Sequence, residues 1–233
     1  MSASRALAAE FVGTALLLAA VVGSGIMAER LAAGNVALAL LANSLATGGA
    51  LIALILCFGP VSGAHFNPAV TLMDATQGGI GAARVSGYIA VQVAGACAGV
   101  AAAHLMFGQP VYTFSSHVRA GPSQLFSEFI ATFGLLSTIW GCSRSRPQAA
   151  PHAVAAYIVA AYWFTASTSF ANPAVTLARA LTDTFAGIRP VDVMPFIVAQ
   201  LAGAATATWL FRWLAPLAPA RVMVPHEAED AAP

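Results

Sequence analysis

The sequence Asn-Pro-Ala-Val-Thr occurs twice in this 233-residue chain, at residues 67–71 and at residues 172–176. Each copy reads as the start of a helix, because an Asn side chain can accept hydrogen bonds from the unpaired N–H groups of a first turn. Pro suits the first helical position, where its missing N–H costs nothing. The apolar segments that follow, 69–73 and 174–178, are too short to cross a hydrocarbon core about 30 Å thick. We therefore expect two half-helices.

Two half-helices that meet N-terminus to N-terminus at the membrane midplane would complete one span. Their junction would gather two positive helix-dipole ends, and the two Asn side-chain amides would be free to donate to whatever lies between them. Irregular backbone at this depth is tolerated only where protein buries it or where it lines a water-filled cavity. The motif thus predicts a pore for neutral, hydrogen-bonding solutes, at which cations meet positive helix ends and are disfavoured.

The composition decides against the alternative reading, in which the two motifs begin ordinary capped helices of a soluble protein. Hydrophobic residues make up 59% of the chain and charged residues 8%, and the mean hydropathy is +0.78. Soluble domains carry about 25% charged residues. We expect a polytopic membrane protein with the lipid bilayer as its environment. Its first apolar run reads as the first span rather than as a cleavable signal peptide, and a net charge of +1 gives no indication of nucleic-acid binding.

Apolar runs divide the chain into two halves of three spans each. We expect residues 1–120 to hold the first half, residues 121–214 the second, and residues 215–233 a disordered acidic tail. Sequence matches relate the halves in the same order: 10–14 matches 128–132, and 88–96 matches 196–204. Because each half holds an odd number of spans, the second half is inverted in the membrane. The expected spans are 6–27, 36–58, 84–106, 124–141, 152–164 and 191–214, with Pro60 and Gly63 ending the second.

Glu10 and Glu128 occupy matching positions in the first span of each half. An ionisable residue within a span is a functional hypothesis by default. Because each Glu recurs near its own re-entrant loop, we expect its carboxylate to accept hydrogen bonds from unpaired N–H groups of that loop. A proton relay is the alternative.

No catalytic or metal-binding arrangement is visible in the sequence. The chain has no phosphate-binding loop and no nucleophile–base pair, and its five His residues lack the spacing of metal ligands. We expect neither an enzyme nor a cofactor. The alternatives to a passive channel are a secondary transporter, since inverted repeats and broken helices also occur there, and a non-conducting junction or scaffold protein.

These features resemble the aquaporin, or major intrinsic protein, family. The resemblance rests on residues 62–71, on the second Asn-Pro-Ala and on the repeated Glu and Gln motifs, and it extends from Ala8 to about Leu214. It implies an all-α membrane protein with six transmembrane helices plus two re-entrant half-helices, assembled as a homotetramer with one pore per subunit. The implied pore motifs are Asn67, Pro68, Ala69, Asn172, Pro173 and Ala174, and the implied ladder of carbonyl acceptors is Gly63, Ala64, His65, Thr168, Ser169 and Phe170.

The chain departs from the family at the narrow outer filter. The family places Arg three residues after the second Asn, whereas this chain has Val175, and the other filter positions, matched by spacing, fall on Thr47, Ala160 and Ser169. A shift in that alignment would bring Tyr162, Trp163 or Phe170 to the constriction instead. Four small uncharged side chains predict a wide constriction that passes neutral solutes larger than water.

This filter resembles that of a bacterial aquaglyceroporin subgroup associated with arsenic resistance, in which Val also replaces the Arg. The resemblance implies passage of glycerol-like polyols, arsenite and methylated arsenicals as well as water. An ordinary water or glycerol channel is the alternative.

Asp74 and Arg179 each follow their own Asn by seven residues, about two helical turns. We hypothesise that Arg179 lies in the outer vestibule, where it partly replaces the missing filter charge, and that Asp74 lies at the inner mouth. The alternative is that both side chains snorkel to the interface or pair with neighbours.

The distribution of Arg residues favours cytoplasmic termini for a multi-pass protein of the inner (plasma) membrane. In that orientation the inside holds Arg5, Arg84, Arg144, Arg146, Arg212 and Arg221, and the outside holds Arg30, Arg119, Arg179 and Arg189.

Overall fold

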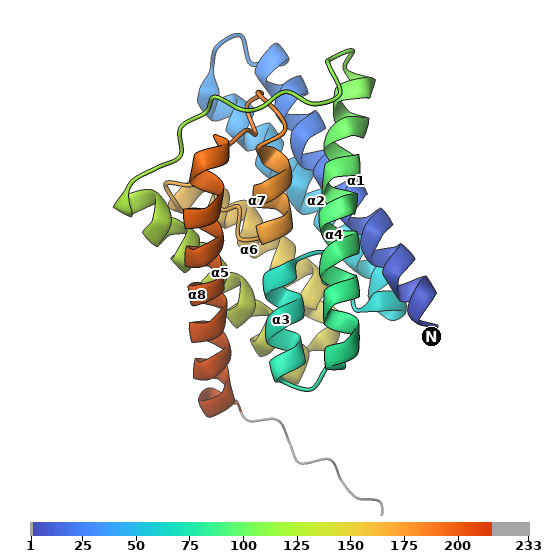
Figure 1. Ribbon diagram of the computed structural model, residues 1–233. Helices are drawn as coiled ribbons and strands as arrows, with labels where there is room; N and C mark the ends of the chain where they lie inside the picture. Colours follow the sequence, from blue (N-terminus) through green and yellow to red (C-terminus); the bar gives the residue numbers. More distant parts are fainter. Residues whose placement is uncertain (1, 216–233) are drawn as a thin grey trace, which may run out of the picture.

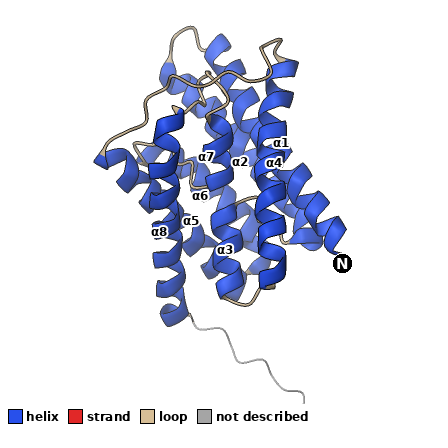
Figure 2. Ribbon diagram, in the orientation of Figure 1, coloured by secondary structure: helices blue, strands red, loops and turns tan. Residues whose placement is uncertain are grey.

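The computed structural model describes residues 2–215, which form helices and connecting loops without strands (Figures 1 and 2). The expected disordered tail, apart from Ala215, lies outside the described residues. The N-terminus and the end of the last helix lie toward the same end of the bundle (Figure 1). In chain order the elements are α1 (Ala3–Leu31), α2 (Val36–Ser62), α3 (Pro68–Thr76), α4 (Ala82–Met106), α5 (Pro122–Ser145), η1 (Pro147–Ala149), α6 (Ala150–Phe164), α7 (Pro173–Arg179) and α8 (Pro190–Leu214).

Five of these helices, α1, α2, α4, α5 and α8, are long and apolar enough to cross a membrane. The helix at the sixth expected span, α6, has 15 residues and is preceded by the single turn η1. At 1.5 Å per residue it extends about 22 Å. It therefore falls short of a full hydrocarbon core, unlike the other five.

The second span ends later than the sequence predicts. Pro60 lies inside α2, and the helix continues to Ser62 before Gly63 caps it with a φ of 89°. A glycine in the left-handed region is a common helix end, because it has no Cβ to clash there. Only Gly63 therefore acts as the predicted terminator.

The two half-helices begin at the repeated motifs. Asn67 and Asn172 have φ values of −154° and −158°, and each side-chain oxygen accepts a backbone N–H of the first turn. Pro68 and Pro173 take the first helical positions. Figure 1 shows α7 and α3 one above the other in the middle of the bundle, with their C-terminal ends pointing to opposite ends of the molecule.

Glycines allow the longest helices to pack backbone to backbone, with α1 along α4 and α5 along α8. A Cβ added at Gly95 of α4 would lie 2.4 Å from the carbonyl oxygen of Phe11, and one at Gly203 of α8 would lie 2.2 Å from that of Phe129. The two glycines hold matching positions in the repeats. Small residues at such crossings are how helices associate where no hydrophobic effect operates between them.

We predict that Gly95→Ala destabilises the protein although alanine favours helix. The Phe11 carbonyl would have to move, which we expect to cost about 1–3 kcal/mol. The matched control is Gly49→Ala in α2, where an added Cβ meets nothing within 4 Å. The measurement is the apparent melting temperature in detergent, and a Gly95→Ala protein that melts at or above the wild-type temperature would contradict the packing argument.

Candidate functional site

The loops that lead into the half-helices have the same unusual backbone. Counted from its own Asn, each loop has positive φ at the residues four, three and one before it: Gly63, Ala64 and Phe66 in the first loop, and Thr168, Ser169 and Ala171 in the second. Five of these six residues are not glycine, and the left-handed conformation costs such a residue about 1–2 kcal/mol. The surrounding protein must therefore hold both loops.

Glu10 holds the first loop. Its carboxylate accepts hydrogen bonds from the backbone N–H groups of His65 (3.0 Å) and Phe66 (2.7 Å) and from the Ser62 hydroxyl (2.6 Å). The fourth donor is Nε2 of Gln92 (2.8 Å), which also lies 2.9 Å from the Thr71 hydroxyl. The carboxylate is fully buried, and these four donors stabilise it there.

Glu128 holds the second loop in the same way. It accepts from the N–H groups of Phe170 (2.9 Å) and Ala171 (2.9 Å), from the Ser167 hydroxyl (2.6 Å) and from Nε2 of Gln200 (2.6 Å). Each of its donors matches one around Glu10 by position in the repeat. Because each carboxylate accepts four hydrogen bonds from the protein, the geometry favours a role for Glu10 and Glu128 in supporting the loops over a role in relaying protons.

The side-chain amides of the two Asn residues join the loops across the junction. Nδ2 of Asn67 donates to the carbonyl of Ala171 (2.8 Å), and Nδ2 of Asn172 donates to that of Phe66 (2.7 Å). The expectation that both amides are free is therefore only half right. One N–H of each is used to hold the opposite loop, and one remains for a solute.

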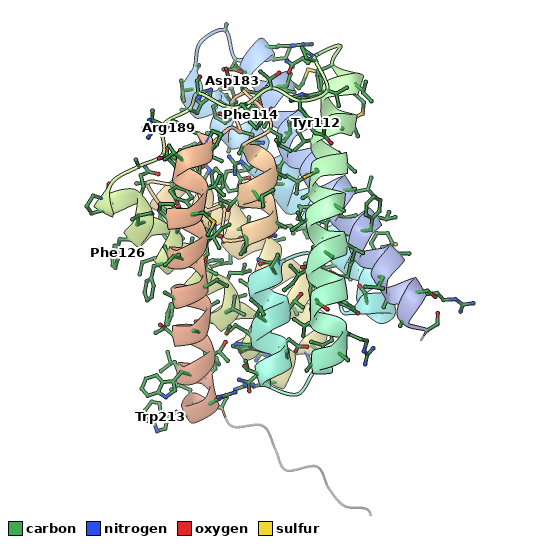
Figure 3. The ribbon with its side chains drawn as sticks, in the orientation of Figure 1. Tyr112, Phe114, Phe126, Asp183, Arg189 and Trp213 are labelled. Atoms are coloured by element: carbon green, nitrogen blue, oxygen red, sulfur yellow. The ribbon has the colours of Figure 1, made fainter. Side chains whose placement is uncertain are left out.

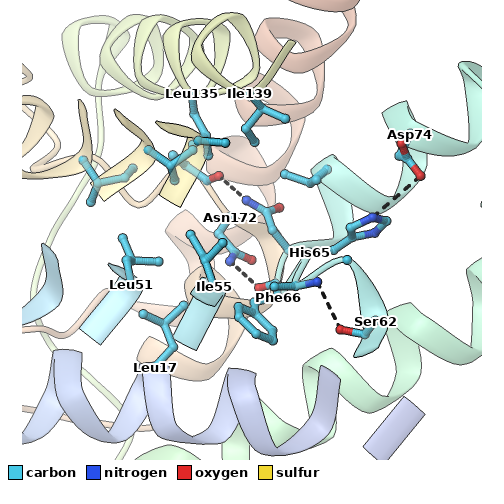
Figure 4. Close-up of a pocket in the computed structure, with 18 of the residues that line it drawn as sticks. Leu17, Leu51, Ile55, Ser62, His65, Phe66, Asp74, Leu135, Ile139 and Asn172 are labelled. Atoms are coloured by element: carbon cyan, nitrogen blue, oxygen red, sulfur yellow. Dashed lines mark hydrogen bonds and ion pairs between the residues drawn. The ribbon is translucent and has the colours of Figure 1, made fainter. Parts of the chain in front are cut away.

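A cavity of about 910 Å³ runs past this junction. Asn67 and Asn172 line it, whereas Pro68, Ala69, Pro173 and Ala174 do not. Figure 4 shows the loop residues His65, Phe66 and Asn172 and, around the same pocket, apolar side chains from other helices. These include Leu17, Leu51, Ile55, Leu135 and Ile139.

Five of the six residues expected to supply carbonyl acceptors line this cavity: Gly63, Ala64, His65, Ser169 and Phe170. Thr168 does not line it. Within residues 2–215, no protein N–H or O–H donates to the carbonyls of 63–65 or of 168–170. Because backbone carbonyls away from bulk water normally find a donor, these oxygens are available to bound solutes.

Three of the four expected filter residues, Thr47, Ser169 and Val175, line the cavity, but Ala160 does not. Ala160 is exposed on the other side of α6. The residues of α6 that reach the cavity follow one another at four-residue intervals on one helix face: Ala150, Val154, Ile158 and Tyr162. Tyr162 lines the cavity where Ala160 was expected to, and its hydroxyl lies 3.2 Å from that of Thr47. Of the other residues that a shifted alignment would bring in, Phe170 lines the cavity and Trp163 does not.

Asp74 and Arg179 both line the cavity. Because the half-helices point away from each other, these residues lie toward its opposite ends, which we call the α3 end and the α7 end. At the α3 end, Asp74 lies 3.6 Å from Nε2 of His65 (Figure 4). At the α7 end, Arg179 is only 2% exposed, with its Nε donating to the Ala186 carbonyl and its Cζ 3.4 Å from the centre of the Phe170 ring. Arg179 therefore packs inward and does not snorkel.

No sequence pattern indicates a role for Arg119, which lies on the connection between α4 and α5. Its guanidinium donates to the carbonyls of Gly187 (2.8 Å) and Ser167 (3.1 Å) and lies over the ring of Phe170, with 4.9 Å from Cζ to the ring centre. Burial lowers the pKa of this guanidinium. All these partners lie about 50 to 70 residues away in sequence, so no local pattern indicates the contact.

In the part of the chain that the structure describes, no group of three or more His, Cys, Asp or Glu side chains could hold a metal ion.

We predict that Glu10→Gln destabilises the protein and abolishes solute flux. A glutamine offers one acceptor oxygen where four donors converge, and its amide would face loop N–H groups. A hydrogen bond to a charged group contributes about 1.5–3 kcal/mol, so we expect a loss of that order. Glu29→Gln, at the exposed end of the same helix, is the control. Wild-type thermal stability and wild-type flux in Glu10→Gln would refute this role.

Comparisons with known proteins agree with this geometry. The sequence profile described as major intrinsic protein matches residues 1–166. Aquaglyceroporin AqpS of Rhizobium meliloti (strain 1021) is 53% identical over 230 residues, which cover 99% of this chain and 97% of that protein. Aquaporin NIP1-3 of Oryza sativa subsp. japonica is 34% identical over 169 residues, covering 70% of this chain and 58% of that protein.

Among solved structures, the X-ray structure of the aquaglyceroporin from Plasmodium falciparum superposes with a TM-score of 0.74. It is 22% identical and the match covers 92% of this chain and 98% of that one. The likeness confirms the predicted fold class, an aquaporin-like helical bundle. With the matching profile and a relative similar over its full length, this chain belongs to the major intrinsic protein family, a family of membrane channels and not of enzymes.

Proposed function

We propose that this protein is a passive channel for neutral solutes larger than water, including glycerol-like polyols and undissociated arsenite. Methylated arsenicals belong to the same proposal because they are bulkier and also neutral. The observation that carries this proposal is that the cavity wall combines hydrogen-bonding groups with apolar side chains. Unbonded loop carbonyls and two Asn amides line it together with apolar side chains. A polyol has the same two kinds of surface, hydroxyl groups and carbon–hydrogen groups.

The constriction that we propose consists of Thr47, Tyr162, Ser169 and Val175 at the α7 end. Val175 is neutral and ends at its methyl groups, so it neither donates a hydrogen bond nor reaches across the cavity. The Tyr162 ring makes this filter narrower than a set containing Ala160 would be. Its hydroxyl gives a passing solute one donor or acceptor beside the Thr47 hydroxyl.

The wider setting is also a proposal. We propose a homotetramer in the inner (plasma) membrane, with both termini cytoplasmic. The larger number of Arg residues on the side of the termini supports this orientation. Arg212, which donates to the Thr76 carbonyl at the end of α3, lies on that side, and Arg30, which donates to the Phe107 carbonyl, lies at the opposite end. The relative that matches along its full length is an aquaglyceroporin, which favours this function over a secondary transporter.

We expect Val175→Arg to narrow the channel. A guanidinium at residue 175 would enter the constriction from α7 and bind solute hydroxyls or water. Glycerol and larger polyols should lose flux relative to water by about tenfold or more, the scale on which a fitted site discriminates by size. The measurement is a swelling series of proteoliposomes in water, glycerol, larger polyols and arsenite.

The control for that substitution is Val191→Arg, an exposed position at the start of α8, where the long side chain can reach water. A wild-type protein that conducts water but neither polyols nor arsenite would overturn the proposed function. An unchanged polyol range in Val175→Arg would remove Val175 from the filter.

Tyr162→Leu tests the corrected filter. The substitution removes a ring and a hydroxyl from the cavity wall, so the largest polyol that passes should increase in size. Tyr112→Leu is the matched control, because Tyr112 is half exposed on the connection after α4 (Figure 3). The same swelling series is the readout, and an identical size limit in Tyr162→Leu and wild type would show that Tyr162 does not form the constriction.

A further inference from the structure

Two arginines share one aromatic ring at the α7 end of the cavity. Cζ of Arg179 lies 3.4 Å from the centre of the Phe170 ring, and Cζ of Arg119 lies 4.9 Å from the same centre. Arg179 belongs to the half-helix itself. Arg119 belongs to the connection 107–121, which crosses the upper end of the molecule in Figure 1. Residues far apart in sequence thus bring two positive charges together.

Within residues 2–215, neither guanidinium forms an ion pair, and the nearby carboxylate of Glu128 is occupied by four hydrogen-bond donors of its own. In the described part of the chain, the ion pairs are His65–Asp74, His117–Asp183 and Arg189–Asp192, so no carboxylate lies within 4 Å of either guanidinium. Asp192 does accept the backbone N–H of Arg119 (2.9 Å), but its side chain is paired with Arg189. Arginine keeps its proton even though burial lowers the pKa of Arg119, because its unperturbed pKa is so high. Both groups are cations at neutral pH.

Arg119 lies behind the cavity wall. Phe170, Ser169 and Arg179 line the cavity, whereas Arg119 does not. Its guanidinium donates to the carbonyls of Gly187 and Ser167. It therefore offers a passing solute a positive potential across the Phe170 ring and no hydrogen bond. In a site of low dielectric constant that potential is poorly screened.

We infer that Arg119 is a charge-selectivity residue of this channel, which with Arg179 excludes protons and inorganic cations at the α7 end, where Val175 supplies no charge. The inference rests on the proposed function and adds a residue to it. It explains why a wide, uncharged constriction need not leak ions. Two like charges beside one ring repel each other and so destabilise the fold. Proteins retain unfavourable interactions of this kind mainly at functional sites.

The experiment separates charge selectivity from solute flux. Wild type, Arg119→Gln, Arg119→Met and Arg119→Lys are reconstituted in proteoliposomes that contain a pH-sensitive dye. Proton flux after a pH step, potassium flux down a gradient and glycerol-driven swelling are measured on the same preparations. The control is Arg30→Gln, because Arg30 also lies over a ring (Cζ to Phe107, 5.0 Å) and donates to a carbonyl, but does not line the cavity.

Arg119→Gln and Arg119→Met should raise proton and potassium flux on the order of tenfold, the effect of removing one charge near the pore. Their glycerol flux should stay within about twofold of wild type, because glycerol is neutral and the substitutions remove only an electrostatic interaction with charged solutes. Arg119→Lys keeps the positive charge and should exclude protons and potassium as the wild type does. Arg30→Gln should also behave as wild type.

Unchanged cation flux in both uncharged variants would overturn the inference while leaving the proposed function intact. Cation leakage of Arg119→Lys equal to that of Arg119→Gln would overturn it too. Failure of both uncharged variants to fold, with Arg119→Lys folding, would assign Arg119 a structural role and also refute the inference. Absence of glycerol flux in the wild type would instead refute the proposed function.

Discussion

A backbone that enters the membrane without forming a helix must find hydrogen-bond partners inside the protein, because lipid offers none. In this channel two buried carboxylates meet that need. Glu10 and Glu128 each accept two consecutive loop N–H groups, a serine hydroxyl and a glutamine amide. An unsatisfied buried amide costs a few kcal/mol. Without these acceptors the loops could not keep their left-handed residues, and the half-helices could not meet.

The same arrangement makes the loops useful. Since the carboxylates take N–H groups of each loop, the carbonyls of 63–65 and 168–170 have no protein donor within the described residues. Asn67 and Asn172 then fix the loops to each other, each with one amide N–H. The result is a row of acceptors with two donors at its centre. Stability and solute binding thus come from complementary groups of the same backbone.

The two ends of the cavity differ although the halves repeat. The α3 end carries Asp74 beside His65, and the α7 end carries Arg179 on Phe170. Both half-helix N-termini add positive potential at the centre. A neutral solute crosses such a field at little cost, whereas a cation meets positive groups both at the junction and at the α7 end. Steric width and charge exclusion can therefore be set by different residues in this channel.

The sequence by itself determined the half-helices, the inverted repeat and the pairing of each Glu with a loop, because these follow from local capping, span length and internal repetition. It expected Ala160 at the cavity, which this residue does not line, because counting back from Asn172 across the loop 165–171 does not fix which face of α6 turns inward. The four-residue spacing of Val154, Ile158 and Tyr162 settles that face only once the bundle is assembled. Only tertiary structure placed Arg119 beside Phe170, since that contact depends on how a connection folds over the bundle.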